Sequence, residues 1–151
     1  MSVLIAVHIL AAVVWVGGMF FALMALRPAT AELEPPVRLG LWRRTLGRFL
    51  AWVWAAIAAL LLSGYAMVLF ELGGFAAVGL HVHLMQATGL VMILLFLHLW
   101  FAPWARLKRL LEAGDVPGAG AELNRIRQIV TVNLVLGLIT VVLGAAGRYW
   151  G

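Results

Sequence analysis

The chain alternates long apolar stretches with shorter basic, glycine-containing or proline-containing stretches. The first apolar stretch, residues 3–26, has no formal charge, and His8 is its one ionisable side chain. About 20 helical residues cross a hydrocarbon layer of roughly 30 Å, so this stretch is long enough to span a bilayer. Comparable stretches follow it, and the pattern predicts spans at about residues 3–26, 49–70, 79–102 and 129–146.

Composition supports a membrane protein. Of the 151 residues, 65% are hydrophobic and 11% are charged, whereas soluble domains are about half apolar and a quarter charged. We therefore predict an all-α fold, in which residues 1–151 form a single domain. Short loops between four spans favour an integral-membrane, antiparallel four-helix bundle. Its expected partner is the lipid bilayer, and a homodimer is a candidate assembly.

The net charge of +5 is concentrated in the two loops that follow the first and third spans. Loops rich in arginine and lysine remain in the cytoplasm, which predicts that both termini are periplasmic and that the protein lies in a bacterial inner membrane. Topology accounts for the charge, so no nucleic-acid partner is expected.

Candidate chemistry is limited by the absence of cysteine. Disulfides, iron–sulfur clusters and thiolate metal sites are excluded, which leaves histidine, methionine, amide, tyrosine and carboxylate ligands. An ionisable side chain inside a span is by default a functional candidate. The candidates here are the histidines, His8, His81, His83 and His98.

The first span places His8, Ala12 and Trp15 at helical spacing on one face. Small side chains let a flat ligand come close to a helix backbone. His8 and His83 lie at similar depths in the first and third spans, which both begin at the outer side, so their imidazoles can meet. Two histidine ligands suit a haem used for electron transfer. The pattern predicts haem b held by His8 and His83 in the periplasmic half of the bundle.

The other two histidines are weaker candidates. His81 and His83 are two positions apart and point to opposite faces of a helix, and we expect the deeper His83 to face inward. His98 is fifteen positions beyond His83, roughly 22 Å along the helix axis. We therefore expect His98 at the cytoplasmic side, away from the site.

Three classes of function stay open. The first is a haem-binding membrane oxidoreductase or electron-transfer protein with a redox partner or a quinone. The second is a copper-binding or copper-transport protein, because imidazole and thioether suit Cu(I). Its candidate ligands are the four histidines His8, His81, His83 and His98, while the scattered methionines favour packing. The third is a structural subunit without a cofactor.

Residues 8–18, HILAAVVWVGG, resemble the opening helix of the copper-resistance protein D (CopD) family and that of the HemJ-type protoporphyrinogen oxidases. Residues 46–49, LGRF, running to Ser63 and Gly64, are similar to the second CopD segment. The resemblance implies a bacterial four-helix unit linked to copper handling or to haem and porphyrin chemistry. It also implies that His8 is the metal or haem ligand and that Trp15 packs beside it.

Overall fold

The computed structural model describes residues 1–149, except for the side chain of Arg148. Regular structure in this part of the chain is helical throughout. The short elements η1, η2 and η3 are π-helical turns, and η4 is a 3₁₀ turn. In chain order the elements are α1 (Ser2–Phe21), η1 (Ala22–Leu26), α2 (Arg27–Ala29), α3 (Pro35–Ala66), η2 (Met67–Glu71), α4 (Leu80–Leu99), η3 (Trp100–Trp104), α5 (Ala105–Glu112), α6 (Val116–Ala146) and η4 (Gly147–Tyr149).

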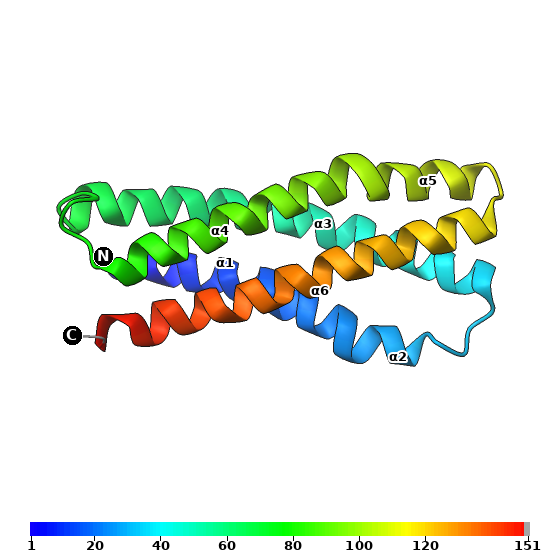
Figure 1. Cartoon of the computed structure of the whole chain (residues 1–151), viewed down its shortest axis with the longest axis horizontal. Coiled ribbons are helices and arrows are strands. Elements are labelled where there is room, and N and C mark those ends of the chain that lie inside the picture. The colour runs from blue at the N-terminus through cyan, green and yellow to red at the C-terminus, as the bar shows by residue number, and fades with distance from the viewer. Residues whose placement is uncertain (150–151) are drawn as a thin grey trace.

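These elements form four continuous rods, each long and apolar enough to cross a membrane. The rods are Ser2–Ala29, Pro35–Glu71, Leu80–Glu112 and Val116–Ala146. Figure 1 shows them running lengthwise, with both termini at one end of the bundle. The prediction of an all-α bundle with four membrane-spanning helices is confirmed. We call the end with the termini the terminal end, and the end with loops 30–34 and 113–115 the basic end.

All four rods are longer than the expected spans. α3 begins at Pro35 rather than near residue 49, because proline is well tolerated in the first turn of a helix. α6 begins at Val116 rather than near residue 129, and the carboxylate of Asp115 caps it by accepting a hydrogen bond from the Gly118 amide at 2.9 Å. Both extensions lie at the basic end.

The third rod continues past its expected end at residue 102. Pro103 lies inside the π-helical turn η3, and α5 follows without a break. Proline lacks an amide hydrogen and its ring displaces the carbonyl one turn earlier, so an α-helix is strained there. The wider π-turn accommodates the ring, and α5 continues the rod and packs on α6.

The four rods pack in the order α3, α1, α6, α4 around the bundle. α1 packs chiefly on α3, α4 chiefly on α6, and contacts between α1 and α6 join the two pairs. α3 and α4 make far fewer contacts, so the seam between them is the loosest side of the bundle. Aromatic rings bridge this seam midway, where the ring centroids of Trp54 and Phe96 are 5.1 Å apart.

The two halves of the bundle are packed differently. Large side chains fill the basic half, in which Leu107 is 0% exposed and Leu39 and Trp42 are 2% exposed. An aromatic cluster closes this core toward the middle, where the Phe96 ring lies edge-on to Trp15 and Trp54 and tilted against Trp100. The terminal half, in contrast, contains a large cavity.

Candidate functional site

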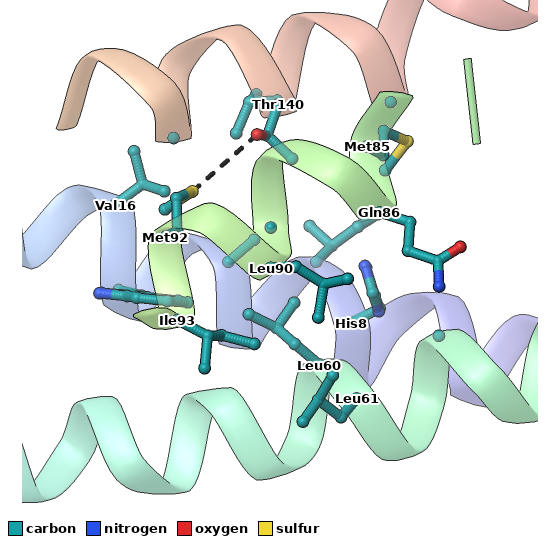
Figure 2. A pocket seen from close by; sticks show the side chains of 18 of the residues that line it. His8, Val16, Leu60, Leu61, Met85, Gln86, Leu90, Met92, Ile93 and Thr140 are labelled. Atoms are coloured by element: carbon teal, nitrogen blue, oxygen red, sulfur yellow. Dashed lines mark hydrogen bonds between the residues drawn. The ribbon is translucent and has the colours of Figure 1, made fainter. Parts of the chain in front are cut away.

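The cavity has a volume of about 540 Å³ and is lined by side chains from all four rods. Its walls are mostly aliphatic, and Trp15 and Met92 lie at the side nearest the aromatic cluster. Figure 2 shows labelled lining residues, among them His8, Met85 and Met92, around this space. The residues with polar or sulfur-containing side chains are His8, Tyr65, Met67, Met85, Gln86, Met92 and Thr140, with Trp15 adding an indole.

His8 is held in the cavity wall by α3. Its Nδ1 atom lies 2.9 Å from the Ser63 hydroxyl oxygen, which in turn lies 2.5 Å from the carbonyl oxygen of Ala59. A hydroxyl has one hydrogen, and Ser63 donates it to the closer carbonyl, so Ser63 accepts a hydrogen bond from His8 Nδ1–H. This tautomer leaves the Nε2 atom with a free lone pair. In Figure 2 the ring reaches from α1 toward α4, on the side of Gln86 and Leu90.

Gly64 makes room for this imidazole. A Cβ atom at position 64 would lie 3.1 Å from His8 Cε1 and 3.5 Å from His8 Nδ1. Consecutive residues of α3 therefore position the same ring, because Ser63 forms a hydrogen bond with it and Gly64 lets it approach the helix. The sequence had pointed to Ser63 and Gly64 only through their similarity to the second CopD segment.

The α4–α6 wall carries two thioethers seated on glycines. A Cβ atom on Gly144 would lie 2.9 Å from Met85 Cε, and one on Gly137 would lie 3.2 Å from Met92 Cε. Between these contacts, the hydroxyl of Thr140 lies 2.7 Å from that of Thr88. It also lies 3.9 Å from the sulfur of Met92, as the dashed line in Figure 2 shows.

A polar contact closes part of the loose seam between α3 and α4. The side-chain amide of Gln86 donates a hydrogen bond to the Tyr65 hydroxyl at 3.0 Å. The Tyr65 ring packs edge-on against Phe75, with centroids 5.9 Å apart. All three residues line the cavity, so these side chains form part of its rim.

The structure brings together three of the predicted site residues and separates the others from them. His8, Ala12 and Trp15 line the cavity along α1. His83 and His98 are exposed, and neither they nor His81 belong to the cavity lining. His81 is half-buried and packs against Gly147 at the end of α6.

The register of α4 on α6 explains this placement. Met85, Thr88 and Met92 share the face of α4 that contacts α6, and His81 lies one turn before Met85 on the same face. His83, two positions from Met85, therefore points away from that face. The expectation that His83 rather than His81 faces inward is not met.

The expected haem ligand pair is consequently not assembled. The cavity contains the imidazole of His8 without a second histidine. Among residues 1–149, no group of three or more histidine, aspartate or glutamate side chains gathers to hold a metal ion. The residues present do not fit a bis-histidine haem, although His8 is combined with three methionine thioethers.

Sequence reasoning missed the residues that complete the cavity. Ser63 was not connected with His8, and Met85 and Met92 were interpreted as packing. One signal was available, because Met85 and Met92 are seven positions apart, as are Gly137 and Gly144. Two helices with large residues on one and small residues on the other at the same spacing can interlock. The spacing alone does not specify which helices pair.

Comparison with known proteins identifies the family. The family described as copper resistance protein D (CopD) matches residues 43–146, which is more than half of the chain and covers most of α3 and all of α4, α5 and α6. His8 precedes the matched residues. No curated protein and no solved structure shows significant similarity to the chain. The four long apolar helices and this match together identify the chain as a multi-pass membrane protein that belongs to the copper resistance protein D family.

Proposed function

We propose that this protein binds copper within the membrane and receives Cu(I) as cargo in the cavity of the terminal half. His8 supplies the imidazole ligand through Nε2. Met67, Met85 and Met92 supply thioethers to the same cavity. Imidazole and thioether ligands suit Cu(I), and family membership supports a link to copper.

The hydrogen bond between His8 and Ser63 is the observation that carries this proposal. Histidines that ligate metals commonly donate their other ring N–H to a neighbouring acceptor, which fixes the tautomer and the orientation of the ring. Ser63 Oγ occupies this position at 2.9 Å from His8 Nδ1.

The distribution of charge favours one side of the membrane for the entry of copper. Basic loops favour the cytoplasm, so the basic end faces the cytoplasm and the cavity lies in the outer half of an inner membrane. Copper then reaches His8 from the periplasmic side. The aromatic cluster around Phe96 lies between the cavity and the packed half. Onward movement of copper requires this cluster to rearrange.

Copper titration in detergent tests this function. The purified chain is titrated with Cu(I) under reducing, anaerobic conditions against a chromophoric Cu(I) chelator. We expect His8→Ala to abolish the tightest site, and Met85→Leu combined with Met92→Leu to weaken it. The matched controls are His83→Ala, which removes an exposed histidine, and Met24→Leu, which removes an exposed methionine.

Two outcomes would count against copper. Equal Cu(I) binding by the His8→Ala and His83→Ala variants would show that His8 is not a ligand. A red preparation with a Soret band that disappears in His8→Ala would show that the site binds haem. Metal analysis and a visible spectrum of the same sample distinguish these results.

A further inference from the structure

A second polar site lies at the basic end and is built around Trp42. This side chain is 2% exposed, and its indole N–H donates a hydrogen bond to the Thr30 hydroxyl at 3.1 Å. The Thr30 hydroxyl also lies 3.0 Å from the carbonyl oxygen of Leu26 and 3.2 Å from that of Arg27. The contacts fasten the last turn of the first rod, with Arg27, against α3.

Two more arginines lie near Trp42. The guanidinium carbon of Arg127 lies 5.0 Å from the centroid of the Trp42 ring, in a cation–π contact. Arg38 lies one turn before Trp42 on α3, and its guanidinium donates a hydrogen bond to the Ala31 carbonyl at 3.3 Å. Arg27, Arg38 and Arg127 thus come from three rods and lie near one another at the basic end. We call them the arginine triad.

The arginine triad has no anionic partner in the described part of the chain. Neighbouring arginines are paired: Arg43 lies 2.9 Å from Glu112, and Glu122 lies 2.6 Å from Arg125 and 3.1 Å from Arg106. None of the triad forms such an ion pair within residues 1–149, although Glu32 and Glu34 lie in the adjacent loop.

Arg127 is the least satisfied member of the triad. Its Nε atom is buried without a hydrogen-bond partner. The guanidinium is partly desolvated, and the positive charges of Arg27 and Arg38 repel it. An anion placed among these three guanidinium groups would offset their mutual repulsion.

We propose that the arginine triad binds the phosphate group of an anionic phospholipid. Guanidinium groups donate paired hydrogen bonds to phosphate oxygens, and basic pockets between transmembrane helices bind anionic headgroups. The surroundings favour a lipid over free phosphate, because Met24, about one turn before Arg27, and Val37, next to Arg38, are exposed apolar side chains at 58% and 59%. These side chains can contact the acyl chains of the same lipid.

Native mass spectrometry of the full chain in detergent tests the site. The protein is mixed with phosphatidylglycerol or phosphatidylcholine, and the fraction that retains one lipid is measured. Wild type is expected to retain phosphatidylglycerol preferentially. A headgroup contact of about 1 kcal/mol per arginine predicts that Arg127→Gln lowers this affinity about five-fold and that Arg38→Gln combined with Arg127→Gln lowers it about 25-fold.

Arg44→Gln is the matched control. Arg44 is an exposed arginine in the same rod as Arg38, and it forms no ion pair among the described residues. It is expected to leave lipid retention unchanged, and size-exclusion and circular dichroism profiles identify variants that fold. Equal losses in the Arg44 and Arg127 variants would reduce the effect to diffuse attraction and overturn the proposal. Displacement of the lipid by inorganic phosphate at equal concentration would overturn it in favour of a soluble anion.

Discussion

His8 Nδ1 and Ser63 Oγ lie 2.9 Å apart although the residues are 55 positions apart in the chain. The contact joins α1 to α3 and fixes which ring nitrogen of His8 carries the hydrogen. It also leaves Nε2 available beside a cavity that contains three thioethers. The proposed copper site depends on this pair, so its disruption gives the most direct prediction.

Ser63→Ala is expected to lower Cu(I) affinity about ten-fold while His8 remains present, because groups that orient a metal ligand commonly contribute this much. The measurement is the same chelator competition. Thr131→Ala is the matched control, since the Thr131 hydroxyl donates to the Arg127 carbonyl of its own helix and is exposed. If both variants bind copper like wild type, Ser63 does not position the ligand.

Gly64→Ala is expected to weaken copper binding by displacing the His8 ring. The added Cβ would lie 3.1 Å from His8 Cε1, which is too close for an unshifted imidazole. Gly89→Ala is the control, because Gly89 lines the same cavity but its Cβ would meet no atom within 4 Å. Similar affinities for the two variants would show that the position of the ring does not matter.

Adjacent glycines of α1 are expected to differ in their effect on stability. A Cβ on Gly18 would overlap the Phe49 ring, whereas one on Gly17 would meet nothing within 4 Å. Gly18→Ala should destabilise the protein by about 1–3 kcal/mol through overpacking. Gly17→Ala should be neutral or stabilise it by up to about 1 kcal/mol, because alanine favours a helix. Unfolding by dodecyl sulfate in mixed detergent micelles measures both changes. A larger loss of stability for Gly17→Ala than for Gly18→Ala would contradict the packing of α1 on α3.

Glu122→Gln is expected to destabilise the basic end by about 2 kcal/mol, because it removes a buried carboxylate that faces two guanidinium groups. Glu122 lies 2.6 Å from Arg125 and 3.1 Å from Arg106, and its side chain is 7% exposed. Glu112→Gln breaks the exposed pair with Arg43 and should cost about 0.5 kcal/mol. The same unfolding experiment compares them, and equal costs would show that burial of Glu122 is unimportant.

Much of the architecture was predictable because it follows from local properties of the chain. An apolar stretch without charges must avoid water, and a bilayer accepts it only when its backbone bonds are satisfied within a helix. Helical periodicity also put His8, Ala12 and Trp15 on one face, and all three line the cavity. The extra length of the rods at the basic end was less evident, because polar helices there carry no strong hydropathy signal.

The sequence by itself therefore determined the four spans, the cysteine-free ligand set and the α1 face that carries His8. Tertiary structure decided which side chains meet that face. Lipid is as apolar as leucine, so hydropathy does not distinguish the side of a span that faces lipid from the side that faces its neighbours. Close packing sets the rotation instead: Met85 and Met92 fit over Gly144 and Gly137. That fit directs His83 outward and leaves His8 with sulfur neighbours rather than with a second imidazole.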